Sequence, residues 1–374
     1  MKNLTNKTYR KAGIVGILSL FLFLAYSCKE SLTDVNTNEN EPTEAATSYL
    51  MTNAQKDLAD NYWGEFPLGY FGSYYAQYWS SNQYTEESQY QYRPGVVNNI
   101  WDVYYETMLS LQQIIEQNRN NPNVAAAYGN NANQIAAAQI LKAWTFQTIT
   151  DIWGSAPYTE ALQGAENASP AYDSQEKIYS SLIDTLESAR DAIVEGEPVF
   201  NSGDIIFDGD ATKWKRFANA LIMRLAIREA DAATEEAKDA FQKAYQSGAM
   251  QSNDDNALFV YLSDSPNNNP MNEAYKTRDD FAVSETLMGF MNDHNDPRRG
   301  AYAEPAVNDG NQKYSGFPYG MKGSDAKSYK NNEPWSRPSE RVREATAPAI
   351  FMTYSEVLFN EAEAAERDWI SADP

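Results

Sequence analysis

Residues 210–228, which run DATKWKRFANALIMRLAIR, carry the pattern that decides the fold. Asp210 stands where the N-cap of a helix belongs, because a side-chain oxygen there can accept a hydrogen bond from a free backbone N–H group of the first turn. Apolar side chains then recur at spacings of three and four residues, which is the period of one helix face. The apolar positions are Trp214, Phe217, Leu221 and Leu225. The segment therefore predicts a long helix with one face in a hydrophobic core.

Two arginines, Arg224 and Arg228, lie beside this apolar stripe on the same predicted helix. An unpaired charge on a nearly apolar helix is costly, because nothing replaces the water that it loses on burial. We therefore expect each guanidinium group to pair with a buried acid or a backbone carbonyl group. This interpretation gives both arginines a structural role.

The helical period continues on both sides and predicts a mainly α fold built of helical hairpins with long aromatic-rich loops. The cleanest amphipathic helix is predicted at 174–195, where Asp173 as N-cap and Glu176 form a capping box. Residues 252–347 are rich in Asn, Asp, Gly and Pro and predict loops, and Ala257–Leu262 is a candidate strand. The remaining predicted helices span 44–61, 97–118, 132–150 and 234–246, and a last one begins near Thr353.

The N-terminal segment has the layout of an export signal. Basic residues precede an apolar run at 12–25, which is too short to span a bilayer comfortably. Tyr26, Ser27 and Cys28 come next, and the arrangement resembles the bacterial lipobox, in which the cysteine is acylated and becomes the first residue. We predict a signal peptide at 1–27, lipid on Cys28, a flexible tether at 28–43 and one domain at 44–374. The alternative is an ordinary signal that carries a free cysteine.

The composition excludes several classes of function. The formal net charge of −22 argues against binding to nucleic acid, whose phosphates need a basic surface. The same charge argues against electrostatic attachment to anionic lipid, so attachment to a membrane would depend on the N-terminal lipid alone. One cysteine allows no intrachain disulfide, so the hydrophobic core must hold the fold.

The residues available for catalysis or metal binding are few. The one histidine, His294, excludes a multi-histidine metal site, and no nucleophile-elbow or phosphate-loop motif occurs. Asp293–Asp296 could hold calcium, although a capped turn is the simpler interpretation, so no cofactor is expected. Acidic residues are so numerous that a glycosidase-type carboxylate pair stays open.

Aromatic residues gather at 62–105, which holds 15 of the 48 in the chain. Flat rings bury the apolar faces of a sugar or peptide, and neighbouring amides bond its polar groups. The first candidate set is Trp79 as a stacking platform at a loop tip, with Tyr78, Asn82 and Tyr84 beside it. A second set lies in later loops and comprises Tyr302, Tyr314, Tyr319 and Trp335. The alternative for any of these rings is packing in the core.

Five stretches in order resemble one family. They are TDIWGSAPY at 150–158, YDSQEKIY at 172–179, the helix at 210–228, DPR at 296–298, and the helix at 354–364 that begins YSE and contains EAEA. Together with the lipobox they resemble the SusD/RagB-like outer-membrane nutrient-binding lipoproteins, in a subgroup with an Asn-rich opening. The resemblance covers nearly the whole chain.

The resemblance implies helical hairpins of tetratricopeptide type and a lipid-anchored protein on the cell surface of the outer membrane. It implies a TonB-dependent SusC-like barrel transporter as partner, an oligosaccharide or oligopeptide as ligand, and no catalysis. Family members usually continue further, so we expect this chain to be incomplete at its C-terminus and less stable than a longer form. Two alternatives remain: a surface glycoside hydrolase that uses a carboxylate pair, and a helical-repeat adaptor that binds protein.

Overall fold

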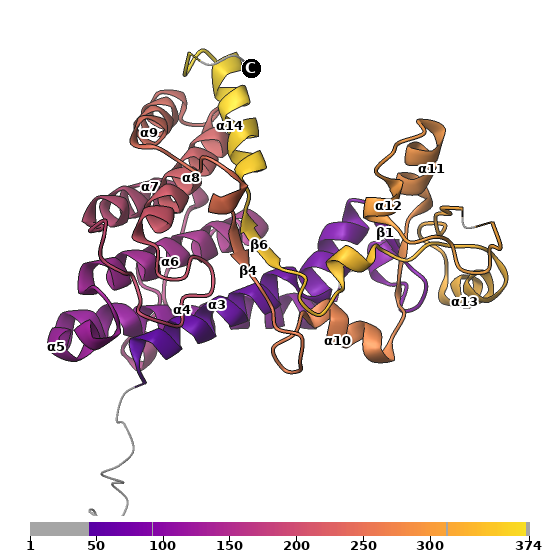
Figure 1. Cartoon of the computed structure of the whole chain (residues 1–374), viewed down its shortest axis with the longest axis horizontal. Coiled ribbons are helices and arrows are strands. Elements are labelled where there is room, and N and C mark those ends of the chain that lie inside the picture. Colours follow the sequence, from indigo (N-terminus) through magenta and orange to yellow (C-terminus); the bar gives the residue numbers. More distant parts are fainter. Residues whose placement is uncertain (1–44, 92, 312, 372–374) are drawn as a thin grey trace, which may run out of the picture. The chain divides into compact units, whose positions relative to one another are not determined.

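The computed structural model describes residues 45–91, 93–311 and 313–371, and the elements named below belong to one compact unit that begins at Ala46. The described chain is mainly helical, as predicted (Figure 1). The predicted signal peptide, Cys28 and the tether lie outside the described residues, so those expectations stay predictions.

Six long helices form the scaffold, and each packs against the next long helix along the chain, so they form helical hairpins (Figure 1). They enclose one large apolar core in which Trp144 and Trp214 are fully buried. Five of the six cover the predicted helices, with ends that differ by a few residues, and the sixth is the helix at 210–228. The six helices are α3 (Thr47–Trp63), α4 (Pro94–Asn120), α6 (Asn131–Trp153), α7 (Gln175–Ala192), α8 (Ala211–Glu229) and α9 (Thr234–Ser247).

The helix starts follow local capping chemistry, with one correction. Asp210 caps α8 as predicted, because its Oδ1 accepts a hydrogen bond from the backbone N–H of Lys213 at 3.1 Å. Asp173 does not cap α7. Ser174 is the N-cap, and its Oγ accepts from the N–H of Lys177. The carboxylate of Asp173 instead accepts from the backbone and the hydroxyl of Thr159, at 2.7 and 2.8 Å.

Both arginines of α8 are paired, but their partner acids are not buried as expected, because Glu356 is half-buried and Asp151 is exposed. Arg224 Nη2 donates to Glu356 Oε2 at 2.8 Å and to the carbonyl of Phe351 at 3.1 Å. Arg228 forms an ion pair with Asp151 at 3.0 Å. Glu356 lies in α14 (Tyr354–Glu366), whose N-cap is Thr353, so the pairing with Arg224 attaches α14 to α8.

Strands are short and pair over long sequence separations. The described residues contain three antiparallel sheets of two strands each. The pairs are β1 (Trp79–Ser81) with β5 (Phe281–Val283), β2 (Ala156–Pro157) with β3 (Tyr172–Asp173), and β4 (Ala257–Phe259) with β6 (Ala349–Met352). β4 occupies the first half of the candidate strand at 257–262.

Short helices of three kinds, α, 3₁₀ and π, lie outside the scaffold of six long helices. A π-helix spans Glu65–Ser73, and a 3₁₀ turn spans Glu87–Gln89. Trp79 of β1 and Phe281 of β5 belong to a small apolar cluster that is separate from the main core. The loop-rich segment at 252–347 contains four short α-helices, α10 (Pro270–Thr277), α11 (Glu285–Asp293), α12 (Arg299–Tyr302) and α13 (Gly323–Asn332).

Candidate functional site

Trp79, expected as an exposed stacking platform, lies in a strand and not at a loop tip. Its side chain is 7% exposed and its ring packs edge-on against Phe281, with centroids 5.6 Å apart. The pairing of Trp79 with Val283 across the sheet fixes this position. An exposed platform is therefore incorrect for Trp79, because its ring area is already buried against the protein.

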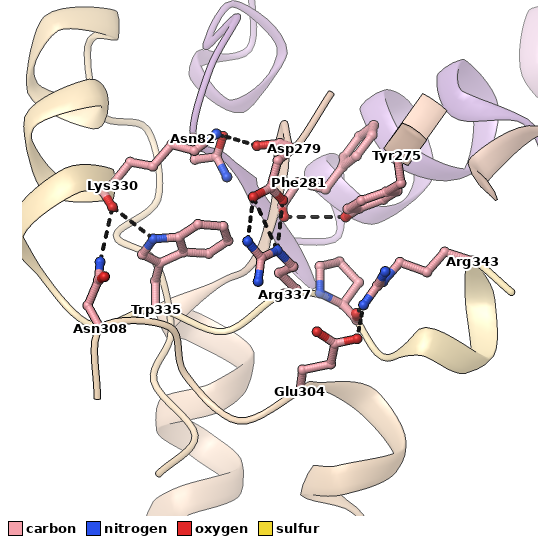
Figure 2. Close-up of polar contacts among 11 residues, drawn as sticks. Asn82, Tyr275, Asp279, Phe281, Glu304, Asn308, Lys330, Trp335, Arg337 and Arg343 are labelled. Atoms are coloured by element: carbon pink, nitrogen blue, oxygen red, sulfur yellow. Dashed lines mark hydrogen bonds and ion pairs between the residues drawn. The ribbon is translucent and has the colours of Figure 1, made fainter. Parts of the chain in front are cut away.

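Asn82 belongs to a buried polar network (Figure 2). Its side chain is 1% exposed, and its Oδ1 accepts a hydrogen bond from Lys330 Nζ at 3.0 Å. Lys330 Nζ also donates to the carbonyl of Asp279, whose carboxylate pairs with Arg337 at 2.7 Å. Burial lowers the pKa of Lys330, and the hydrogen bond from Arg337 to Asp279 raises the pKa of Arg337. This network ties α13 to the end of β1, so the arrangement gives Asn82 a structural role.

Trp335 forms the other side of the same network. Its side chain is 2% exposed, and its Nε1 donates to the carbonyl of Lys330 at 3.1 Å (Figure 2). The guanidinium of Arg337 lies 5.3 Å from the ring centroid, and Phe317 packs edge-on at 6.2 Å. An indole enclosed in this way has no free face to offer a ligand, so the expected ligand contact is not supported for Trp335.

Tyr78 and Tyr84 are both exposed, but they do not belong to one cluster. Tyr84 has φ of +55°, and its ring faces the guanidinium of Arg278 at 5.2 Å. Tyr78 lies beside Gln77, and its backbone carbonyl accepts from the N–H of Ser284. Ligand contact by Tyr78 and Tyr84 stays a prediction.

Two exposed tyrosines, Tyr75 and Tyr90, and the half-buried Tyr319 form a group that we call the tyrosine cluster. The rings of Tyr75 and Tyr90 stack with centroids 5.5 Å apart and planes 29° apart. Tyr319 lies 6.0 Å from Tyr90, and its hydroxyl donates to the carbonyl of Tyr74 at 2.6 Å. Burial raises the pKa of Tyr319, so this hydroxyl stays a donor at neutral pH. Tyr90 is 55% exposed, so its ring remains available.

An amide is held at the edge of the tyrosine cluster. Gln77 Nε2 donates to the hydroxyl of Tyr90 at 3.0 Å, and its Oε1 accepts from Thr286 at 3.0 Å. Gln77 and Tyr90 both have positive φ, of 56° and 57°, so two tight turns present these side chains. Tyr90 lies in the aromatic-rich segment at 62–105, but this geometry cannot be predicted from the sequence, because it depends on tertiary pairing with β5 and α11.

An apolar cavity of about 590 Å³ adjoins the tyrosine cluster at Tyr75. It lies where α3, the π-helix, α4 and the end of α6 meet. Its walls are almost wholly apolar, so it can receive a hydrophobic group but offers few polar partners. The lining includes Tyr62, Trp63, Phe71, Tyr75, Ile152 and Trp153.

The turn at Asp293–Asp296 has a clear structural role. Asp296 pairs with Arg298 at 2.7 Å, and this hydrogen bonding lowers the pKa of Asp296 to about 2. His294 Nδ1 contacts the carbonyl of Phe290 at 2.8 Å. Within the described ranges, no three His, Cys, Asp or Glu side chains converge as metal ligands would. Nearby, Tyr302 is exposed and Tyr314 packs on a small cluster formed by Met288 and its neighbours.

Comparisons with known proteins agree with this architecture. A family model described as starch-binding and associating with the outer membrane matches residues 39–374. No curated protein matches the chain. No helix within the described part of the chain has the length and apolar character to cross a membrane.

Solved structures share the fold. A chitin-binding protein superposes with a TM-score of 0.74 at 26% identity, over 87% of this chain and 71% of its own. A SusD homologue from Bacteroides thetaiotaomicron superposes with a TM-score of 0.70 at 26% identity, over 88% of this chain and 66% of its own. A chitin-binding SusD homologue from Flavobacterium johnsoniae superposes with a TM-score of 0.70 at 22% identity, over 86% of this chain and 67% of its own. At this identity the likeness is one of fold alone.

Proposed function

This chain belongs to the SusD-like family, and from that premise we propose that it is a cell-surface lipoprotein that binds oligosaccharide and passes it to a TonB-dependent barrel transporter. The family is one of outer-membrane-associated binding proteins without catalytic activity, so the chain is a nutrient-binding protein and not an enzyme. The anchor, the partner and the sugar are the parts that we propose.

The observation that carries the proposed ligand is the tyrosine cluster. Tyr75 and Tyr90 present stacked rings, and Gln77 holds an amide beside them. A pyranose ring has apolar C–H faces and hydroxyl edges, which match rings and an amide placed side by side. The starch-binding description of the family and the chitin-binding neighbour at 26% identity support a neutral glycan over an oligopeptide.

The proposed anchor and partner depend on sequence and family. Cys28 follows the apolar run at 12–25 after Tyr26 and Ser27, which is the place of the acylated cysteine in a lipobox. The formal charge of −22 leaves electrostatic attraction to anionic lipid with little to contribute, which supports attachment through acyl chains. A binding protein held at the outer membrane needs a route for its ligand across that membrane, and a barrel transporter would provide it.

Binding is tested by replacing the exposed ring. Tyr90→Ala removes one face of the stack, so we expect affinity for maltoheptaose or chitohexaose to fall about tenfold, from a loss of about 1.4 kcal/mol. Isothermal titration of the full chain in detergent measures the affinity, and a melting curve of the same sample reports its stability. The matched control is Tyr49→Ala, an exposed tyrosine on α3 that should change neither.

Two results would contradict the proposal. If Tyr90→Ala and the unaltered protein bind the sugar with equal affinity, the tyrosine cluster is not the binding site. Binding of a mixed pool of oligopeptides, without binding of either sugar, would assign the protein to peptide capture. The transporter partnership is tested separately, by affinity purification of the full chain from outer membranes and a search for a co-purified barrel.

A further inference from the structure

A second cavity, of about 470 Å³, lies between α4, the end of α6 and β3. It shares no residue with the tyrosine cluster. Its lining combines three aromatic rings with polar side chains, whereas the neighbouring apolar cavity has almost no polar group. The lining residues are Asn98, Trp101, Asp102, Trp153, Ser155 and Tyr172.

We propose that this cavity is a second carbohydrate-binding site, for one or two pyranose units of a neutral oligosaccharide. The inference rests on the proposed function, because it assumes that the protein binds glycan, and it adds a site that the tyrosine cluster does not include. Three features carry it: the ring geometry, the rigidity of the ring supports, and the unused polar groups.

The three rings form a corner. The planes of Trp101 and Trp153 are 87° apart with centroids 5.1 Å apart, and the plane of Tyr172 is 15° from that of Trp101. A ligand in the corner would meet one ring face-on and another edge-on. The centroids of Trp101 and Tyr172 are 6.4 Å apart, and Tyr172 is 64% exposed, so its outer face is open to a ligand.

The supports of these rings are fixed by the backbone. Tyr172 pairs with Pro157 across β2 and β3, and the hydroxyl of Tyr105 donates to the carbonyl of Pro157 at 2.7 Å. Trp153 is the last residue of α6, and Gly154 ends that helix with φ of +77°, a value that glycine adopts without strain. A preformed site binds without the cost of ordering its side chains first.

The polar groups are available to a ligand. Asn98 and Asp102 are four residues apart on α4, so they lie on one face of the helix with Trp101 beside them. Both side chains are exposed, and neither forms a hydrogen bond or ion pair with any other described residue. A carboxylate accepts hydrogen bonds from sugar hydroxyls, and an amide can both donate and accept.

The charge of the site selects the class of sugar. Asp102 is the one charged group in the lining, and the whole chain carries −22. A uronic acid or a sulfated sugar would meet a like charge, so a neutral or N-acetylated sugar is favoured. The apolar cavity of about 590 Å³ is lined by both Trp153 and Tyr75, so it adjoins this site and the tyrosine cluster.

The test compares site variants in the full chain in detergent. Tyr172→Ala and Asp102→Ala change exposed side chains and leave the helix scaffold in place, and Tyr49→Ala is the matched control. Isothermal titration with chitohexaose and with maltoheptaose should resolve two binding events in the unaltered protein. We expect Tyr172→Ala and Asp102→Ala each to weaken one event about tenfold, while Tyr90→Ala weakens the other.

Melting curves on the same samples separate a lost contact from a lost fold, and Trp101→Phe provides a further variant that keeps a ring of smaller area. A single binding event that Tyr90→Ala removes and that Tyr172→Ala and Asp102→Ala leave unchanged would overturn the second site and leave the proposed function intact. No binding of either sugar by the unaltered protein would overturn both.

Discussion

At the scale of single residues, Asp204 shows how one buried carboxylate organises a junction without a cation. Its Oδ2 accepts from Trp214 Nε1 at 2.7 Å and from the N–H of Gly209 at 3.0 Å. Its Oδ1 accepts from Gln55 Nε2 at 2.7 Å and from the N–H of Phe207 at 3.3 Å. These four bonds join α3, the loop before α8 and α8 itself, because a carboxylate provides only acceptors and every neighbour here donates.

Asp204→Asn tests this arrangement. The amide would place an N–H group against at least one of the present donors, so we expect the free energy of unfolding to fall by about 2–3 kcal/mol. Urea unfolding followed by circular dichroism measures the change. The matched control is Asp208→Asn, an exposed position four residues away, which should change stability by less than about 0.5 kcal/mol. Equal stability of both variants would show that the bonds at Asp204 contribute little.

At the scale of elements, the helices could be predicted from the sequence and the short strands could not. The period of the apolar residues locates α7 and α8, because the hydrogen bonds of a helix join residues that are close in the sequence. β1 exists only because β5 pairs with it about 200 residues later, and that pairing buries Trp79. The burial of Asn82 and Trp335 could not be predicted for the same reason, since Lys330 connects the two side chains only in the folded chain.

The start of α7 gives a prediction about pH. The hydrogen bond from Lys177 and that from the backbone of Thr159 lower the pKa of Asp173 to about 2, below its ordinary value of 3.8. A lowered pKa in the folded state stabilises the protein above the ordinary value, and this stability is lost as the pH falls toward 2. The junction of β2, β3 and α7 should therefore loosen in acid.

Asp173→Asn should cost about 1 kcal/mol at pH 6, a modest value because Lys177 is half exposed. The difference from the unaltered protein should narrow steadily between pH 4 and pH 2, measured by urea unfolding at several pH values. Asp208→Asn is again the control, at an exposed position outside this junction. A gap between Asp173→Asn and the unaltered protein that stays constant over this range would show that the charge of Asp173 does not stabilise the fold.

At the scale of the whole molecule, scaffold and candidate sites come from different kinds of segment. The helical hairpins use local contacts between consecutive helices. The tyrosine cluster instead joins residues 75, 90 and 319, and the proposed second site joins residues 101, 153 and 172. Aromatic composition indicated the first region, but only the folded chain separates exposed rings from packed ones. The described residues therefore carry both proposed binding sites, whereas the proposed attachment to the membrane involves the N-terminal segment outside them.

That division leads to a prediction about Cys28. If acyl chains on this cysteine alone hold the protein at the membrane, Cys28→Ala should move it into the soluble fraction, because each buried CH₂ group contributes about 0.8 kcal/mol. High salt should not release the unaltered protein, since a chain of net charge −22 gains little from anionic lipid. Membrane fractionation with a palmitate label measures both effects, and Cys28→Ala should still melt and bind sugar as before. Retention of Cys28→Ala in the membrane with its label intact would show that the protein is held by another route.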